Sequence, residues 1–146
     1  MIGYRQVRAS QFNANRRQPD SFHRGQATVE LALLLPVILL LLFGIAEFGR
    51  AFNAYITLEN AVREGARLGV TGATDAEILA RVKNVAVTLD ESRLSVEIAP
   101  PEASRRRGDS LIVRASYDFP LLVPIISQLL SSPPLILEAE VAMRVE

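Results

Sequence analysis

The sequence has 146 residues, with sixteen basic and sixteen acidic side chains, no cysteine and one histidine. A chain of this length leaves room for one small folded domain beside the long apolar run near its N-terminus. The lack of cysteine excludes disulfides, a thiolate nucleophile and Cys-type zinc sites, and the single histidine excludes a multi-histidine metal cluster. The net positive charge lies at one end of the chain, which differs from the diffuse basicity of a nucleic-acid-binding protein.

Residues 1–25 form a basic leader with a net charge of +4, so the rest of the chain carries −4. Positive charge next to an apolar segment keeps that end of the segment in the cytoplasm. We therefore expect a cytoplasmic N-terminus and a C-terminal part on the far side of the membrane. The charged residues of the leader are Arg5, Arg8, Arg16, Arg17, Asp20 and Arg24.

The run ATVELALLLPVILLLLFGIA, residues 27–46, predicts a membrane-spanning helix. Twenty helical residues cover about 30 Å, the thickness of the hydrocarbon core of a bilayer. A chain this short cannot cover so uniformly apolar a helix on all sides, which argues against a buried helix of a soluble protein. The run is too long for a secretory signal peptide, and no Ala-x-Ala cleavage site follows it before Glu47. Pro36 leaves the carbonyl of Ala32 without its helical partner and predicts a mild kink.

Glu30 is the one ionisable residue of this run. A carboxylate at the start of a membrane span is costly to bury and usually needs a partner. Glu30 either lies hydrated at the depth of the lipid headgroups or pairs with a positive charge.

Residues 24–67 read RGQATVELALLLPVILLLLFGIAEFGRAFNAYITLENAVREGAR and closely resemble the TadE-like proteins of tight-adherence (Flp-type) pilus systems. Members of this family are minor pilins or pseudopilins, membrane proteins made with a short basic leader. The resemblance rests on the end of the leader, the acidic residue, the Leu-Leu-Pro step, the exit from the span and the helix that follows: Gly25, Glu30, Pro36, Gly44, Glu47-Phe48-Gly49-Arg50 and Arg63-Glu64-Gly65-Ala66-Arg67.

The resemblance implies cleavage by a prepilin peptidase after Gly25, which leaves Gln26 as the new N-terminus. Glu30 would then be the fifth residue of the mature chain, where pilin-like proteins carry a glutamate. Cleavage creates an α-amine on Gln26, and in a bundle of such helices the Glu30 of one subunit can pair with the amine of its neighbour, which selects one register. The sequence departs from the family at Leu31, where relatives often have an aromatic residue. The implied partners are membrane lipid, the prepilin peptidase, other pilin-like subunits and pilus assembly proteins.

Apolar residues continue at helical spacing beyond residue 46, which predicts that the helix extends out of the bilayer. We expect this stripe to pack mainly on its own domain, with subunit contact as the alternative. Gly65 and Gly69 offer a surface of close approach. Thr74-Asp75-Ala76-Glu77 is a capping box and predicts a second helix with Ile78, Val82, Val85 and Leu89 as its core face. The stripe of the first helix comprises Phe48, Phe52, Tyr55, Leu58, Val62, Ala66 and Gly69.

After the second helix the apolar period changes to two, which predicts three strands. The expected fold is α+β, with a long N-terminal helix, a second helix and one antiparallel sheet of about three strands, which is the pilin-like plan. The domains would be a leader at 1–25, a transmembrane helix at 26–46 and an extracytoplasmic domain at 47–146. The inward residues of the strands are Leu94, Val96 and Ile98; Leu111, Val113, Ala115, Tyr117 and Phe119; and Leu135, Leu137, Ala139, Val141, Met143 and Val145.

Two further segments stand between the strands. The apolar run 119–134 contains four prolines, which exclude a second span, and its residues 125–130 are either a short helix or part of a covering loop. Residues 105–110 contain the tripeptide Arg-Gly-Asp, for which we expect a solvated hairpin turn rather than an integrin ligand.

The sequence contains no P-loop, nucleophile elbow or zinc-protease motif. Glu138 and Glu140 lie on the outward face of one predicted strand, where no cleft shifts their chemistry. We therefore expect a non-enzyme without cofactor, metal, nucleic acid or small-molecule substrate. Two functions fit: a TadE-like minor pilin of the cytoplasmic membrane that enters or primes a surface pilus, and an uncleaved membrane-anchored adaptor that presents a small binding domain.

Overall fold

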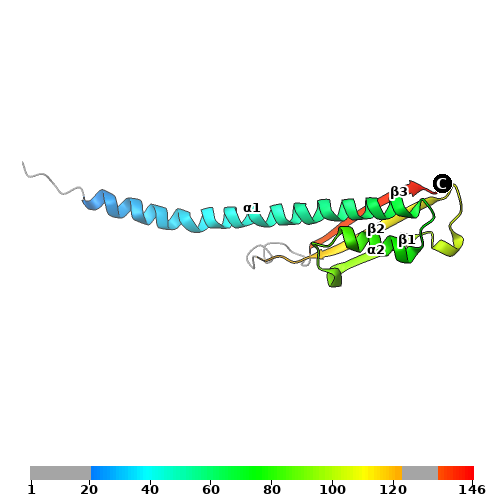
Figure 1. Ribbon diagram of the computed structural model, residues 1–146. Helices are drawn as coiled ribbons and strands as arrows, with labels where there is room; N and C mark the ends of the chain where they lie inside the picture. The colour runs from blue at the N-terminus through cyan, green and yellow to red at the C-terminus, as the bar shows by residue number, and fades with distance from the viewer. Residues whose placement is uncertain (1–20, 123–134) are drawn as a thin grey trace, which may run out of the picture. The chain divides into compact units, whose positions relative to one another are not determined.

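The computed structural model describes residues 21–122 and 135–146, with side chains from Gly25 onward. Most of the basic leader lies outside these residues, as do residues 125–130, for which a short helix and a covering loop were the alternatives. The chain divides into two compact units, Met1–Ile38 and Leu39–Glu146. Its described elements are the helices α1 (Ser21–Gly69) and α2 (Asp75–Val85), two short 3₁₀ turns, and the strands β1 (Leu94–Ala99), β2 (Ser110–Phe119) and β3 (Leu135–Arg144) (Figure 1).

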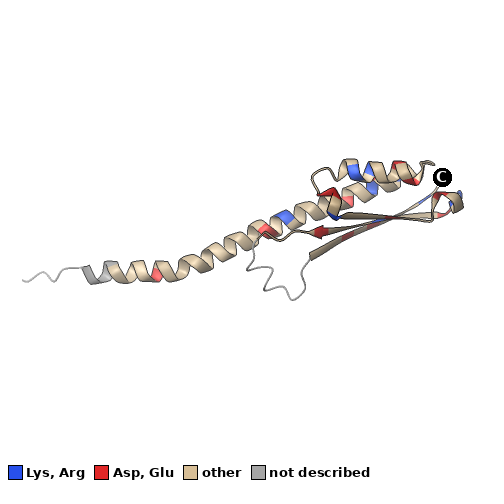
Figure 2. Ribbon diagram, turned by 90° about the horizontal axis from the view of Figure 1, so that it is seen from below, with Lys and Arg blue, Asp and Glu red and all other residues tan. Residues whose placement is uncertain are grey.

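The first half of α1 is an apolar helix whose large side chains are exposed. The exposed residues run from Val29 to Ile45, and Pro36 lies inside the helix. This stretch carries almost no charge (Figure 2). It is long and apolar enough to cross a membrane, and none of its most apolar window is buried within the protein. The exposed helix confirms the predicted apolar segment, and the kink expected at Pro36 stays a prediction.

The second half of α1 packs on its own domain. Leu58, Val62 and Ala66 are fully buried, as predicted, and Ala54 and Ala61 join them. The C-terminal part of the predicted stripe, from Leu58 onward, therefore belongs to the core. The N-terminal part does not, because Phe48, Phe52 and Tyr55 are exposed. Helical periodicity identifies an apolar face but does not say what covers it, and the expected packing on the domain holds for the part of the stripe from Leu58 onward.

Gly65 and Gly69 mark the closest approach of α1 to the rest of the domain. A Cβ added at Gly65 would lie 2.5 Å from Cγ2 of Val82, and one at Gly69 would lie 2.4 Å from Cδ2 of Leu111. These distances are shorter than a van der Waals contact, so the helix packs this closely only because both positions lack a side chain. The predicted close-approach surface is confirmed, and it serves packing within the chain.

Helix α2 begins where the sequence predicts. Thr74 caps its N-terminus, accepting a hydrogen bond from the backbone N–H of Glu77, whose side chain accepts from the backbone N–H of Thr74. This reciprocal pair satisfies two of the donors that every helix N-terminus leaves free. Ile78 and Val82 of α2 are fully buried, whereas the expected core residues Val85 and Leu89 are partly buried.

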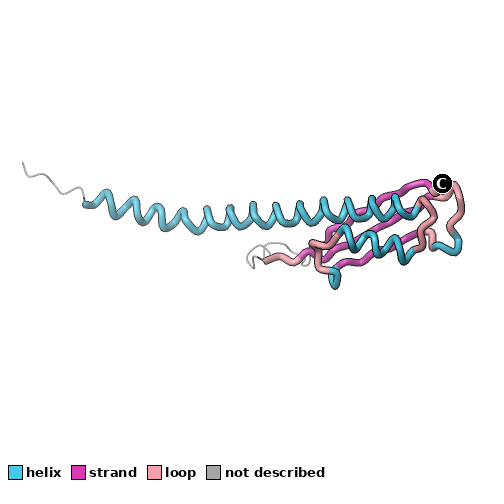
Figure 3. Tube along the Cα trace, in the orientation of Figure 1, coloured by secondary structure: helices cyan, strands magenta, loops and turns pink. Residues whose placement is uncertain are grey.

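The three strands form one antiparallel sheet, as predicted, and their order is β1-β2-β3. Central β2 alternates strictly, and all of its inward residues from Leu111 to Phe119 are buried. In the register, Ala115 lies opposite Val96 on one side and Ala139 on the other. The second half of α1 and α2 lie on one face of this sheet (Figures 2 and 3). The other face carries charged side chains, including Glu138 and Glu140, and Arg114 donates to Glu140 at 2.8 Å.

The connection between β1 and β2 holds the Arg-Gly-Asp tripeptide in a turn. Gly108 has φ +92°, a conformation that favours glycine, and its N–H donates to the carbonyl of Val145. Arg105, which opens the basic run, is not a solvated residue of this turn. Its side chain is 5% exposed, pairs with Asp75 and donates to the carbonyl of Ala73 at 3.0 Å. The expectation of a solvated run was therefore wrong for Arg105, which fastens the connection to the start of α2.

Candidate membrane and assembly interface

The residues expected at the processing point lie near the start of α1. The helix already begins at Ser21, so Gly25 and Gln26 are helical, and both are exposed. A Cβ added at Gly25 would meet no atom within 4 Å. The side-chain amide of Gln26 donates to Oε1 of Glu30 at 3.1 Å, across one helical turn. The structure thus brings Gln26 and Glu30 together on one exposed face.

Glu30 is surrounded on the helix by exposed apolar side chains. Val29, Leu31, Leu33 and Leu34 are all among them. A carboxylate on such a surface is stable in a bilayer only near the headgroups or beside a cation. The surface is therefore suited to contact either lipid or another apolar helix, with Glu30 as its polar point.

At the other end of the apolar stretch, a buried carboxylate ties α1 to the end of β2. Glu47 is 6% exposed, and its Oε1 accepts hydrogen bonds from Arg50 at 2.8 Å and from the backbone N–H of Leu122 at 3.1 Å. The guanidinium of Arg50 lies over the ring of Phe119, 5.0 Å from its centroid. We refer to Glu47, Arg50, Phe119 and Leu122 as the exit clamp.

The exit clamp satisfies a charge that would otherwise be costly to bury, because the carboxylate has both a cation and a backbone donor as partners. Sequence reasoning used Glu47 and Arg50 only as marks of a resemblance and gave them no structural role. Their spacing of three, which places both on one helix face, was the available signal. Their link to the chain after β2 is a tertiary contact, and no local pattern predicts it.

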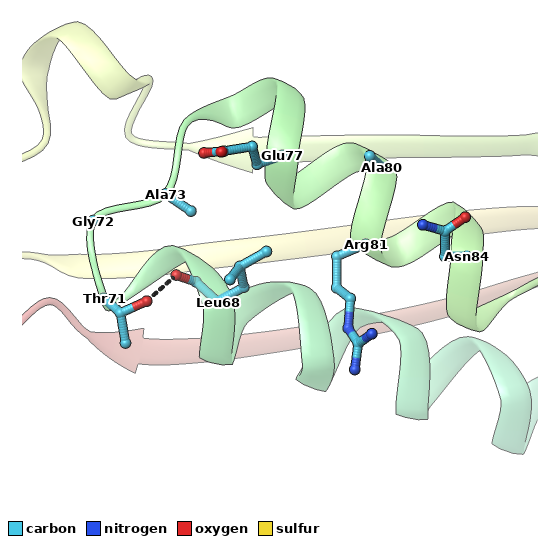
Figure 4. A pocket seen from close by; sticks show the side chains of 8 residues that line it. All are labelled: Leu68, Thr71, Gly72, Ala73, Glu77, Ala80, Arg81 and Asn84. Atoms are coloured by element: carbon cyan, nitrogen blue, oxygen red, sulfur yellow. Dashed lines mark hydrogen bonds between the residues drawn. The ribbon is translucent and has the colours of Figure 1, made fainter.

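An open pocket between the end of α1 and α2 offers little for catalysis (Figure 4). Three of its polar side chains are already engaged within the domain: Arg81 pairs with Glu64 at 2.7 Å, Glu77 belongs to the capping box, and Thr71 donates to the carbonyl of Leu68. Hydrogen bonds from Arg67 and Arg81 lower the pKa of Glu64 to about 2. Paired groups of this kind hold two helices together. The residues that line the pocket are Leu68, Thr71, Gly72, Ala73, Glu77, Ala80, Arg81 and Asn84.

Within residues 21–122 and 135–146, the structure contains no cluster of three His, Asp or Glu side chains able to hold a metal ion. The features that distinguish the described chain are therefore its exposed apolar helix, the Gln26–Glu30 pair at one end and the exit clamp at the other. The first two are exposed, whereas the exit clamp is a buried contact within the chain.

Comparison with known proteins agrees with this description. No curated protein and no solved structure matches the chain. Residues 25–67 match the family model described as TadE-like protein, a structural, pilus-associated family rather than an enzymatic one. The match starts at Gly25, includes the apolar stretch and ends at Arg67 in the buried half of α1. The resemblance expected from the sequence is thereby confirmed over this segment, and a TadE-like segment built on a helix able to span a membrane fits a membrane protein related to tight-adherence pili.

Proposed function

We propose that the protein is a TadE-like minor pilin or pseudopilin, anchored by α1 with its N-terminus in the cytoplasm. A prepilin peptidase would cut between Gly25 and Gln26, and the mature helix would then join other pilin-like subunits. The observation that carries this proposal is the family match, which begins at Gly25 and covers the whole apolar stretch. The exposed apolar surface of α1 supports it, because such a surface suits lipid before assembly and neighbouring helices after it.

In this proposal Glu30 sets the register of assembly. Its side chain already accepts from Gln26, the residue that would carry the new α-amine. An amine on a neighbouring subunit would supply the positive charge that a carboxylate needs among apolar helices. A helix out of register would leave Glu30 unpaired, so the charge pair would reject wrong alignments.

A second candidate is an uncleaved membrane anchor that presents the outer domain to a partner in the envelope. The observation that favours it is the helical backbone at Gly25 and Gln26, since α1 begins four residues earlier, at Ser21. A peptidase acts on an opened backbone, so this first turn would have to unwind before cleavage. The two candidates differ in the N-terminus of the mature protein.

The N-terminus is therefore the decisive measurement. The chain is expressed in membranes with a class-III prepilin peptidase, and the product is examined by intact mass and N-terminal sequencing. We expect a product that begins at Gln26. Gly25→Leu is the matched control and should block cleavage without disturbing the fold, because space around Gly25 is open. If the leader stays while the same peptidase cuts a known prepilin, the adaptor is the correct function.

The role of Glu30 is tested by co-purification with pilus components. Glu30→Ala and Glu30→Gln should both insert in the membrane and both assemble poorly, because neither can pair with an amine. Glu59→Ala, which removes an exposed ion pair with Arg63 at 3.7 Å on the same helix, should assemble normally. Normal assembly of Glu30→Gln would reduce the role of Glu30 to hydrogen bonding. Normal assembly of Glu30→Ala would contradict the register mechanism.

A further inference from the structure

Three aromatic side chains stand exposed on α1 just beyond the apolar stretch. Phe48 is 75% exposed and Phe52 is 55% exposed, and their rings stack with centroids 6.5 Å apart. Tyr55 follows on the same face and is also exposed. We call these three residues the aromatic collar. Aromatic rings bury large apolar areas when another group covers them, so a cluster of exposed rings indicates a surface that contacts lipid or another protein.

The outer domain covers the neighbouring face of the same turns and leaves the collar uncovered. Glu47 and Ala54 are buried and Ala51 packs against the core, although each lies next to a collar residue in the sequence. The collar is instead continuous with the exposed surface below it, because Leu41 and Ile45 precede Phe48 at spacings of seven and three. The same surface thus runs from the apolar stretch onto the collar.

The position of the collar along α1 identifies its surroundings. Glu30 and Arg50 are 20 residues apart, which corresponds to about 30 Å of helix, the thickness of the hydrocarbon core. Polar headgroup layers extend that core by several ångströms on each side. With Glu30 placed at the inner boundary of the hydrocarbon, Phe48 would fall at the outer boundary, and Phe52, about 6 Å further along the helix, would lie in the headgroup layer.

Leu122, which follows β2 in the chain, lies beside the same turn of α1 as Phe48. Leu122 is 66% exposed, and its backbone N–H is bonded to Glu47, one residue before Phe48. The side chain of Arg50, which belongs to the exit clamp, is 39% exposed. Exposed aromatic and aliphatic groups beside an arginine are the combination that anchors proteins at membrane surfaces, since the rings enter the boundary layer and the cation meets phosphate.

We propose that the aromatic collar, with Leu122 and Arg50, seats the outer domain in the headgroup layer of the membrane. The occupant of this surface is lipid. The contact of these residues with lipid, together with the exit clamp, would fix the height of the domain above the bilayer. The inference needs α1 to span the membrane, but it does not need cleavage at Gly25.

The test uses tryptophan as a reporter, since the chain has none. Full-length Phe52→Trp is reconstituted in phosphatidylcholine–phosphatidylglycerol vesicles, with and without lipids brominated high on the acyl chain. Phe48→Trp gives a second reporter, and both sites are open enough to accept the larger ring. Leu68→Trp is the matched control, because it is exposed on the same helix about 24 Å beyond Phe52.

We expect a blue-shifted emission from Phe48→Trp and Phe52→Trp, and at least about twofold stronger bromine quenching than for Leu68→Trp, as for rings at the membrane boundary. Water-like emission without quenching would overturn the proposal. Blue-shifted emission that bromine does not quench would also overturn it, and would assign the collar to a second copy of the chain. All variants keep the leader and meet no peptidase, so failure here and failure of processing are separate results.

Discussion

Both halves of α1 present apolar side chains, yet these side chains have different surroundings. Large side chains from Leu31 to Ile45 are exposed, whereas Ala54, Leu58, Ala61, Val62 and Ala66 are buried in a core that α2 and the sheet complete. Residues 27–45 contain one charged side chain and residues 46–69 contain six, and the two halves also differ in the size of their apolar residues. The exposed half is rich in leucine, and the buried half places alanine and glycine where α2 and β2 approach, as at Gly65 and Gly69. Small residues at helical spacing therefore mark the face of α1 that packs against α2 and β2.

The largest effect should separate these two halves directly. Leu58→Ala removes a fully buried side chain and should lower the free energy of unfolding of the outer domain by about 2–5 kcal/mol. Leu41→Ala makes the same chemical change on the exposed half and should alter it by less than about 0.5 kcal/mol. Urea unfolding of the full chain in nanodiscs, followed by hydrogen exchange of β2 amides, measures both. Equal losses for the two variants would show that the outer domain depends on the exposed half as well.

A smaller effect is expected at the boundary between the halves. Glu47→Ala removes the acceptor of Arg50 and Leu122 and should cost about 1–3 kcal/mol, as for buried polar groups that lose a partner. The amide of Leu122 should exchange faster with solvent, and Glu47→Gln, which keeps an acceptor oxygen, should restore part of its protection. Unchanged exchange at Leu122 in Glu47→Ala would remove the exit clamp as the link between α1 and β2.

The smallest effect concerns the ion pairs that join the far end of α1 to α2. The pKa of Glu64 is about 2 in the folded chain against an ordinary value of 4.5, chiefly because of its hydrogen bonds with Arg67 and Arg81. A lowered pKa means that this contribution to stability is fully present above pH 4.5 and is lost as the pH falls toward 2. The Tm of the full chain should therefore fall over this range, and less steeply in Glu64→Gln. Identical slopes in the two proteins would show that the pair contributes nothing measurable.

Local signals in the sequence predicted most of the elements. The capping box at Thr74 placed the start of α2, and strict alternation placed β1, β2 and β3 with their inward residues. Charge and length marked the apolar stretch of α1. Each of these signals arises from neighbours within a few residues, so it can be read without knowing the tertiary structure.

What the sequence could not supply were contacts between distant segments. The apolar stripe of α1 does not show that its buried part begins near Ala54, because burial depends on where α2 and the sheet pack against the helix. The ion pair of Arg105 with Asp75 joins residues 30 positions apart, and the bond from Leu122 to Glu47 joins residues 75 apart. In both cases an ordinary-looking polar residue gains its role only after folding.

The last residue of the domain is fastened beside the end of α1, where the backbone N–H of Glu146 donates to the carbonyl of Val70 at 3.2 Å. The helix from Ala46 to Gly69 is about 35 Å long, so this bond places residue 146 about 35 Å along the helix from Ala46. Since the chain lacks cysteine, Glu146→Cys would accept one fluorophore. Energy transfer from that dye to acceptors in the bilayer would measure the distance of residue 146 from the membrane surface. This distance becomes shorter as the helix tilts, so it reports the tilt angle.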